Sequence, residues 1–315
     1  MNKFQRVTEI ARYNYFFVYI CRCMSGSPHK LNESGSFLKK CFDTFVSFGK
    51  VILKSKPGQK LPVAGSEKCL VLGNGPSLKQ SLADHPEFFK GNDLLCVNSF
   101  SVTDEYTLLK PAYYVMLDPG LWLGAHAVAI KTFEDLRTKT SWPLTLFIPV
   151  TARNQPAFAE LKKANPTITI VFFNYTPYRG FKKIGHWLFR KNLAMPQSQN
   201  VLVAALFIAV NMKFPEVYVF GADHTWHQNL HINENNMLCL KDVHFYEQEE
   251  KISYRPFYRD PTNTATFTMY EILVTFSKVF LGYFVLNEYA KSRNCTIYNA
   301  STVSFIDALK RIKIQ

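Results

Sequence analysis

Residues 69–78 read CLVLGNGPSL, and this stretch decides the fold class. Its four apolar residues predict a buried strand, and the glycine-rich turn after them is typical of a strand that leads into a helix. Backbone N–H groups in such a turn can approach a phosphate at the positive end of the helix. The candidate contacts are Gly73, Asn74, Gly75 and Ser77. An ordinary tight turn is the alternative, since the stretch is neither a dinucleotide fingerprint nor a Walker loop.

Short apolar runs of the same kind recur outward from this stretch, with helical segments between them. Strands are expected at 94–98, 113–117, 144–150, 168–173, 217–220 and 296–298. A buried crossover helix is expected at 201–210 and a final helix at about 270–293. Near-continuous apolar strands alternating with helices predict an α/β class, a Rossmann-like, mostly parallel sheet with helices on both faces.

The domain organisation follows from changes in composition along the chain. Two amphipathic helices are expected at 1–24 and 37–54, and the Pro- and Gly-containing stretch 56–66 is a linker. We therefore divide the chain into a basic helical extension, 1–60, and a catalytic domain, 67–315. Residues about 224–266 are polar and weakly periodic, which favours a lid insertion in that domain.

The net charge of +13 is concentrated near the N-terminus, where residues 1–60 alone carry +8. Basic helices rich in Phe can lie in the headgroup region of an acidic membrane, so a peripheral contact with the cytoplasmic face of an inner membrane is one expectation. The alternative is that both helices pack on the domain and their lysines are solvated. No nucleic-acid-binding motif accompanies the charge, so we expect no nucleic-acid partner.

Composition and cysteine content favour a cytoplasmic protein. The 315 residues are 47% hydrophobic, enough for a large core, and disorder is excluded. The seven cysteines are odd in number and lie mostly in apolar segments, which argues against a disulfide framework. No secretory signal is visible, and the apolar runs 201–210 and 272–286 are too short, or carry Lys278, to be expected to span a membrane.

Polar residues end three of the expected strands. Asn98 ends the second, Asp118 follows the third, and Asp223 with His224 follows the strand 217–220. Because open α/β sheets bind ligands at the carboxyl ends of their strands, these positions predict a nucleotide site.

Four motifs together resemble a known family. GNGPSLK at 73–79, VNSF with TDEY within 97–106, LDPGLW at 117–122 and EVYVFGAD at 216–223 resemble the bacterial sialyltransferases of glycosyltransferase family 42. They are equally similar to the broader family related to the archaeal 6-hydroxymethylpterin diphosphokinases and the motility-accessory flagellin glycosylation proteins. The resemblance covers roughly residues 68–310 and is strongest in the first half.

The resemblance implies roles for particular residues. Asn74 and its neighbouring glycines would touch the nucleotide phosphates, and Asn98 the sugar nucleotide. Asp118, where the family usually has Asn, would lie near the cytidine or ribose. Ser198 and Asn200 belong to the segment corresponding to the one that holds the donor, and Asp223 closes the site. The family also implies a metal-independent reaction with no cofactor other than the CMP-sugar donor.

The sequence departs from this family where its general base lies, since Thr275 to Lys278 contains no histidine. Histidine suits proton transfer near neutral pH, and the lid supplies His224 as the best-placed candidate, then His244 and His227. For each of them a structural role is the alternative. A metal held by His224, His227 and His231 is a further, less favoured alternative.

Arg255 and Tyr258 in the lid are candidate contacts for a phosphate or a carboxylate, because guanidinium forks and phenol hydroxyls donate to both. They suit an acidic donor such as a CMP-activated nonulosonic acid or Kdo; a solvated loop is the alternative. Near the C-terminus, Asn299 and Ser301 are candidate ligand contacts. The alternative is that Ser301 or Ser304 is the N-cap of a helix.

These observations lead to one hypothesis and two alternatives. The leading hypothesis is a metal-independent glycosyltransferase that moves a sugar from a CMP-activated acidic donor to a surface polysaccharide or lipid-linked glycan. The second is an ATP-dependent diphosphotransferase of the pterin type, with Asp118 and Asp223 as Mg²⁺ ligands. A nucleic-acid-binding protein is the third and rests on charge alone.

Overall fold

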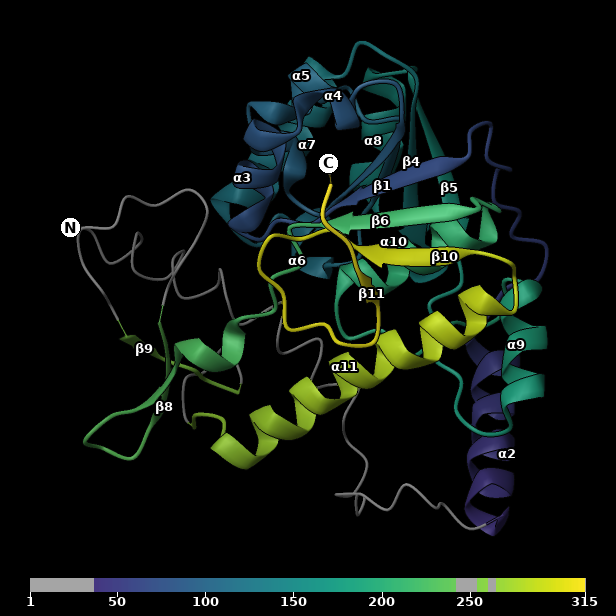
Figure 1. Ribbon diagram of the computed structural model, residues 1–315, viewed down its shortest axis with the longest axis vertical. Helices are drawn as coiled ribbons and strands as arrows, with labels where there is room; N and C mark the ends of the chain where they lie inside the picture. The colour runs from purple at the N-terminus through teal and green to yellow at the C-terminus, as the bar shows by residue number, and fades with distance from the viewer. Residues whose placement is uncertain (1–36, 242–253, 260–264, 315) are drawn as a thin grey trace.

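A computed structural model describes residues 37–241, 254–259 and 265–314 (Figure 1). Its centre is an eight-stranded sheet in the order β11-β10-β6-β1-β2-β3-β4-β5, and every strand pair in it is parallel. The strands are β1 (Lys68–Leu72), β2 (Asp93–Val97), β3 (Tyr113–Val115), β4 (Leu144–Pro149), β5 (Ile168–Phe173), β6 (Glu216–Phe220), β10 (Thr296–Asn299) and β11 (Lys310–Arg311). The predicted Rossmann-like α/β class is confirmed.

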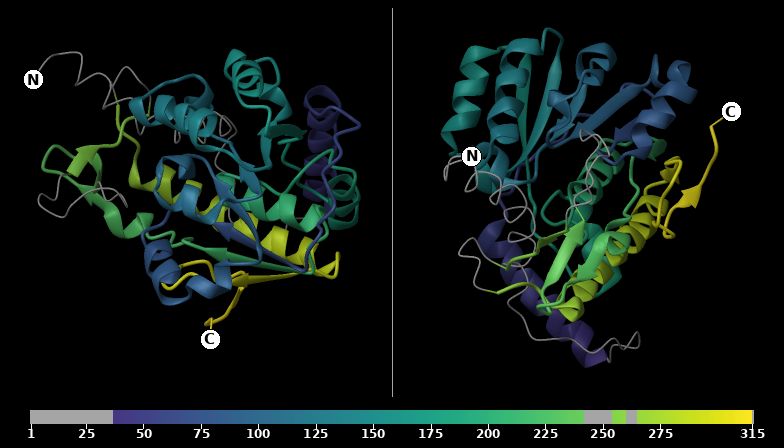
Figure 2. Two further views of the ribbon diagram at one scale, coloured as in Figure 1. Left: turned by 90° about the horizontal axis from the view of Figure 1, so that it is seen from above. Right: turned by 90° about the vertical axis from the view of Figure 1, so that its left-hand side faces the viewer.

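Helices cover both faces of this sheet (Figures 1 and 2). They are α2 (Phe37–Lys54), α3 (Ser77–Asp84), α4 (Pro86–Phe89), α5 (Glu105–Leu109), α6 (Pro119–Trp122), α7 (Ala127–Lys139), α8 (Pro156–Ala164), α9 (Lys182–Arg190), α10 (Val201–Asn211) and α11 (Met269–Lys291). Short 3-10 turns are η1 (Phe100–Val102), η2 (Val150–Ala152) and η3 (Trp226–Asn229).

Alternate side chains of each strand enter two separate cores, as the pleat of a strand requires. In β1, Cys69 and Val71 join the core formed with α9, α10 and α11. Leu70 and Leu72 join the other core, with α3 to α8. All but the last residue of α10 is buried, which explains why its sequence is apolar on every side and shows no amphipathic period.

The predicted elements of the domain agree with the structure to within one or two residues, including the helix 37–54. The expected helix at 1–24 lies outside the described residues. Two features were not predicted: the edge strand β11, and a small antiparallel sheet within the lid region. That sheet consists of β7 (Leu230–Ile232), β8 (Leu238–Lys241) and β9 (Tyr254–Pro256).

The small sheet attaches to the start of α11 through an apolar cluster of its own. Leu238 and Phe257 pack there with Phe267, Ile272 and Phe276. Figures 1 and 2 place this sheet on the side toward which β6 and β10 point. The described part of the region predicted as a lid therefore lies beyond the carboxyl edge of the main sheet, and lid motion stays a prediction.

Helix α11 covers nearly the residues expected for the final helix, 269–291 against about 270–293. It has 23 residues and is long and apolar enough, by length and composition, to cross a membrane, so the expectation that no segment reaches this length is wrong. The helix extends beyond the apolar run at both ends. One of its faces, including Val279, Tyr283 and Leu286, is buried in the core shared with α10.

Candidate functional site

The strand order reverses between β1 and β6. From β1 the chain adds β2 to β5 on one side, whereas β6, β10 and β11 lie on the other. Ligands of open parallel sheets bind at the carboxyl edge of such a switch point. Two turns meet at this edge, residues 73–76 after β1 and residues 221–224 after β6.

The two turns are in direct backbone contact. Gly73 N–H donates to the Phe220 carbonyl (2.8 Å), and Gly75 N–H donates to the Gly221 carbonyl (2.9 Å). A Cβ on Gly75 would lie 2.5 Å from the Gly221 oxygen. Gly221 itself has φ +61°, a conformation that favours glycine. These glycines are therefore required by the close approach of the two turns.

The N-terminus of α3 holds the carboxylate of Asp223. Ser77 N–H donates to Asp223 Oδ2 (3.0 Å), and the Ser77 hydroxyl donates to Oδ1. Burial raises the pKa of Asp223, and the two bonds from Ser77 oppose this rise. The positive end of α3 thus faces an anion supplied by the protein.

This arrangement corrects the phosphate-cradle interpretation of the first turn. Gly73, Gly75 and Ser77 were expected to offer donors to a phosphate, but the N–H donors of all three, and the Ser77 hydroxyl, bond to β6 and the turn after it. The physical reason is that Asp223 already occupies the anion position at α3. These residues instead hold the turn after β1 against the turn after β6 through hydrogen bonds.

Two asparagines lie at the ends of β1 and β2. Asn74 is exposed, and its Nδ2 donates to the Val97 carbonyl (3.3 Å). Asn98 adopts φ +48°, which asparagine tolerates better than most residues, and its Oδ1 accepts from Leu117 N–H (3.2 Å). Its Nδ2 takes no part in that bond. The structure thus brings both predicted asparagines to the same edge.

Asp118, at the end of β3, caps the short helix α6. Its Oδ1 accepts from Gly120 N–H (2.9 Å). Burial raises the pKa of this carboxyl, and the bond from Gly120 opposes the rise. The residue sits at the predicted edge, with a helix cap as its observed role.

The N-terminus of α10 lies beside the turn after β6. Asn200 is the N-cap, with Oδ1 accepting from Val203 N–H (3.0 Å). Its Nδ2 lies 3.0 Å from His224 Nε2 and 3.2 Å from the Tyr283 hydroxyl. Ser198 donates to the Asn200 carbonyl (2.6 Å). Both predicted donor-segment residues are therefore at the site, where their observed contacts shape the start of α10.

His224 is enclosed by this network rather than presented to a substrate. Its Nε2 lies 2.8 Å from the Tyr283 hydroxyl, and its ring packs 4.3 Å from that of Trp226. Burial lowers the pKa of His224 to about 3. An imidazole that weak is mismatched to proton transfer near neutral pH, so the geometry does not support His224 as the general base.

Gln199 lies between Ser198 and Asn200, in the segment that the family resemblance indicated, but it was not among the candidate contacts. It is 4% exposed, and neither Oε1 nor Nε2 has a hydrogen-bond partner among the described residues. A buried amide without partners is costly, and a bound ligand can satisfy it. Its position directly before the N-cap of α10 is a second signal for this residue, because helix N-termini bind anions.

The segment after β10 holds the Asp223 turn in place. Ser301 Oγ accepts from Ala222 N–H (3.0 Å), and Phe305 N–H donates to the Asp223 carbonyl (3.0 Å). Asn299 is buried and donates to Ser304 Oγ (2.9 Å). No helix begins within residues 300–309, so the alternative that Ser301 or Ser304 caps one is wrong.

The lid candidates are only partly placed. Arg255 is exposed on β9, opposite Leu240, and Tyr258 forms a bridge with Thr266. His244 lies outside the described residues. His227 is exposed, and its ring packs edge-on against Phe305 (4.4 Å). In the described part of the chain, no group of three or more His, Cys, Asp or Glu is arranged to hold a metal ion.

The fold and the site define a Rossmann-like α/β protein with a candidate ligand edge at its switch point. No protein-family model and no curated protein matches the chain. Among solved structures, the MAf glycosyltransferase from Magnetospirillum magneticum AMB-1 is similar, with a TM-score of 0.44 and 11% identity. The match covers 89% of this chain and 39% of that one, so the chain spans well under half the length of that protein.

Proposed function

We propose that this protein is a glycosyltransferase that binds a nucleotide-activated sugar at the carboxyl edge between β1 and β6. The observation that carries the proposal is the amide of buried Gln199 beside the N-terminus of α10, which has no hydrogen-bond partner within residues 37–241, 254–259 and 265–314. The first N–H groups of a helix have no partner within it, and they attract phosphate. Because Asp223 already fills the N-terminus of α3, α10 offers the donor-phosphate site.

The donor is a CMP-activated acidic sugar, and the acceptor is a surface polysaccharide or a lipid-linked glycan on the cytoplasmic side of a membrane. Support comes from the four motifs that resemble the family 42 sialyltransferases. Asn74 and Asn98 at the same edge then contact the donor, with Arg255 and Tyr258 closing over its carboxylate. Transfer needs stabilisation of the leaving phosphate and a base for the acceptor hydroxyl. His244 is the proposed base.

The test is thermal unfolding of the full chain with CMP, UDP, GDP or ATP, each with and without Mg²⁺. A ligand that binds the folded state alone stabilises it by about 2.7 kcal/mol at a hundred times its Kd. We expect CMP to raise Tm without Mg²⁺. A shift with ATP and Mg²⁺ alone would instead establish the diphosphotransferase alternative.

Gln199→Met separates a ligand contact from a packing role. Methionine keeps the shape and removes both unpartnered polar atoms, so Tm of the free protein should stay constant or rise, while the CMP-induced shift should shrink. Gln80→Met, at an exposed position of α3, is the matched control, and this variant should retain the CMP-induced shift in Tm. An unchanged CMP shift in Gln199→Met would remove this residue from the donor site.

In a transfer assay, His244→Ala should lower kcat by about 10²- to 10⁴-fold.

A further inference from the structure

Helix α2 is attached to the domain through its small polar side chains. Thr44 Oγ1 accepts from Phe181 N–H (3.0 Å), and Ser47 Oγ accepts from Arg179 N–H (2.9 Å). The backbone approaches so closely that a Cβ on Gly180, whose φ is +127°, would lie 2.1 Å from Thr44 Oγ1. The face of α2 that packs on the domain is therefore the one with Thr44, Ser47 and Val51.

The apolar face of α2 is left outside. Its exposed side chains are Phe37, Leu38, Phe42, Phe45, Phe48, Ile52 and Leu53, and all except Phe48 are exposed by 64–80%. Leu38, Phe45 and Ile52 recur at seven-residue intervals, which places them on one side of the helix. An amphipathic helix normally buries this side, so a contiguous exposed apolar patch of this kind marks a surface with a binding partner.

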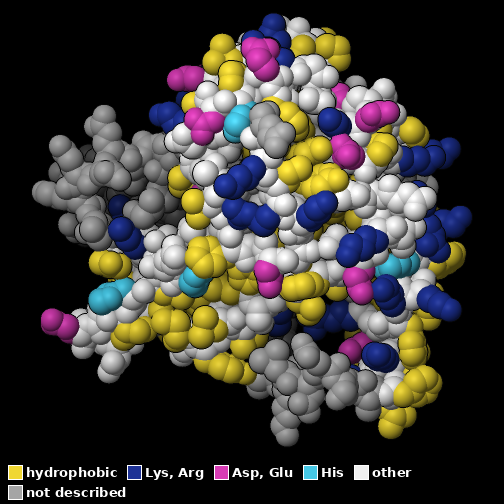
Figure 3. Space-filling view, in the orientation of Figure 1, with side chains coloured by type: hydrophobic (Ala, Val, Ile, Leu, Met, Phe, Trp, Pro, Cys, Tyr) yellow, Lys and Arg dark blue, Asp and Glu magenta, His cyan; other side chains and the backbone are white. Residues whose placement is uncertain are grey.

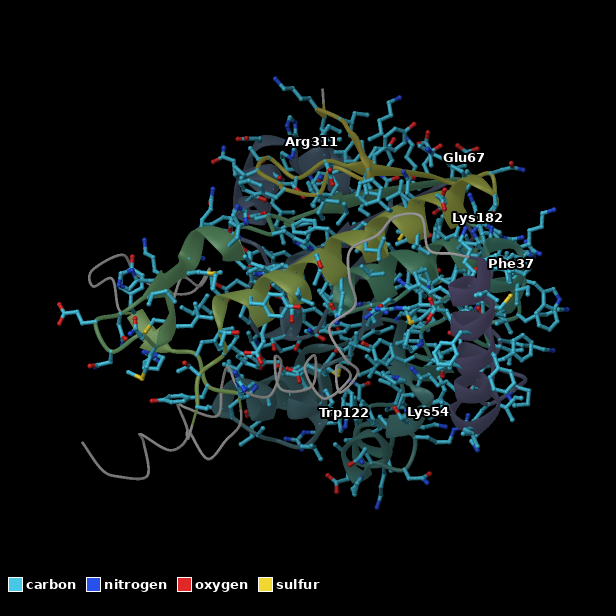
Figure 4. The ribbon with its side chains drawn as sticks, turned by 90° about the horizontal axis from the view of Figure 1, so that it is seen from below. Phe37, Lys54, Glu67, Trp122, Lys182 and Arg311 are labelled. Carbon is cyan, nitrogen blue, oxygen red and sulfur yellow. The ribbon has the colours of Figure 1, made fainter. Side chains whose placement is uncertain are left out.

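The segment that carries this apolar face is also strongly basic. Residues 37–60 contain six lysines and one acidic residue. Helix α9 lies alongside α2, joined to it by the ring contact between Phe37 and Phe181 (5.6 Å), and its charged residues are all basic. In Figure 4, Phe37 and Lys54 mark the two ends of α2, and Lys182 marks the start of α9 near Phe37. Figure 3 shows apolar side chains at the lower end of α2 and basic ones along the adjoining edge.

The charge indicates what kind of partner this surface takes. Two copies of the chain meeting through α2 would bring two basic surfaces together, which like-charge repulsion disfavours. An anionic bilayer satisfies both features, because Phe side chains enter the headgroup boundary while lysine stems reach up to the lipid phosphates. Each lysine near such a surface adds an electrostatic attraction to the anionic lipids, and this attraction decays within about one Debye length of the surface.

We propose that α2, with α9 beside it, docks on the surface of an anionic membrane, with Phe42, Phe45 and Ile52 in the headgroup boundary. The proposal rests on the packing and charge of α2, and it is independent of the donor chemistry.

The experiment is co-sedimentation of the full chain with vesicles of phosphatidylcholine, alone or with about a third phosphatidylglycerol. We expect binding to the anionic vesicles that weakens with salt. Phe45→Gln with Ile52→Gln should lower the partition coefficient at least about tenfold, since two exposed apolar side chains leave the boundary. Lys50→Gln with Lys54→Gln should weaken binding and flatten its salt dependence. Leu108→Gln with Ile130→Gln, exposed on α5 and α7, is the matched control and should bind like the wild type.

All substituted side chains are exposed, so Tm of each variant should remain close to that of the wild type. The proposal is overturned if the wild-type protein does not co-sediment with anionic vesicles, which is the result expected if another segment of the chain covers α2. The proposal is also overturned if vesicles without phosphatidylglycerol bind the protein as strongly as vesicles that contain it. A concentration-dependent dimer in sedimentation velocity that Phe45→Gln with Ile52→Gln dissolves would assign the face to a second copy instead.

Discussion

At the scale of single residues, the site depends on side chains whose protonation is set by burial. His224 combines φ +55°, a buried ring and contacts to Asn200 and Tyr283. Left-handed backbone at a non-glycine residue is costly and concentrates at functional sites, and both His224 and Asn98 adopt it at strand ends. The role we assign to His224 is to hold the turn after β6 against α10 and α11.

The lowered pKa of His224 makes a prediction about stability and pH. In the unfolded chain its pKa is near 6.5, whereas burial lowers it to about 3 in the folded protein. Between these values the unfolded chain binds a proton that the folded protein excludes, so stability present above the unfolded pKa is lost as the pH falls. The slope contributed by this residue approaches about 1.4 kcal/mol per pH unit.

His224→Asn should remove that slope, because asparagine does not titrate and tolerates the same left-handed backbone. Urea unfolding between about pH 7 and pH 5 measures it, with His85→Asn, in the turn between α3 and α4, as control. Equal slopes in wild type and His224→Asn would show that the histidine is protonated in the folded protein.

The glycines of the two turns make a second prediction at this scale. Gly75→Ala places a Cβ 2.5 Å from the Gly221 oxygen and 2.7 Å from Asp223 Oδ1. We expect a loss of about 1–3 kcal/mol in unfolding free energy, since neither backbone nor buried carboxylate can move freely. Gly65→Ala is the matched control, with no atom within 4 Å of its added Cβ. A Tm equal to that of this control would mean that the two turns are not in contact.

At the scale of elements, α11 packs against residues 197–200, the segment that we propose to hold the donor. Its residue Gly282 faces the chain before α10, where a Cβ would lie 2.4 Å from the Gln197 carbonyl oxygen. The next residue, Tyr283, reaches Asn200 and His224. Residues 197–200 can therefore lie this close to α11 only because residue 282 is a glycine, which has no side chain.

Gly282→Ala should destabilise the protein by about 1–3 kcal/mol and reduce the CMP-induced rise in Tm, because it pushes Gln199 and the start of α10 away from α11. Gly49→Ala on α2 is the control, since nothing lies within 4 Å of its added Cβ. There alanine should stabilise the helix by up to about 1 kcal/mol. If both variants shift Tm in the same direction, the contact at Gly282 does not limit packing.

At the scale of the whole molecule, the parallel sheet sets an order of local stability. β1, β2 and β6 are central and buried on both faces, whereas β7, β8 and β9 form a separate small sheet with its own cluster. Segments with many buried contacts open only with the whole fold, and those with few open locally.

Hydrogen exchange should therefore be slowest in β1, β2, β6 and α10, and fastest among the described strands in β7 to β9. Bound CMP should add protection at residues 197–203 and 221–224 while leaving β5 unchanged. Mass spectrometry of peptides after deuterium labelling measures both effects. Added protection confined to β4 and β5 would place the ligand on the other edge of the sheet, against the switch-point argument.

The sequence by itself determined the α/β class, because buried parallel strands such as 69–72 and 217–220 must be apolar throughout. It also located Asn98 and Asp118 at strand ends, and Asp223 at the end of β6, since polar residues interrupt those runs. The amphipathic pattern of 37–54 predicted the helix, but the pattern alone did not decide which face would pack.

The tertiary structure alone decided how these residues are used. Asp223, 146 positions away from Ser77, fills the anion position at α3, which no local pattern records. Burial by α10 and α11 turned His224 from a candidate base into a neutral contact. Burial also left the amide of Gln199 without a hydrogen-bond partner in the part of the chain that the structure describes. The polar face of α2 packed because Gly180 allows a close backbone approach, leaving the phenylalanines outside. Periodicity reports which side chains differ in polarity, whereas pairing, desolvation and exposure depend on what distant segments bring to each position.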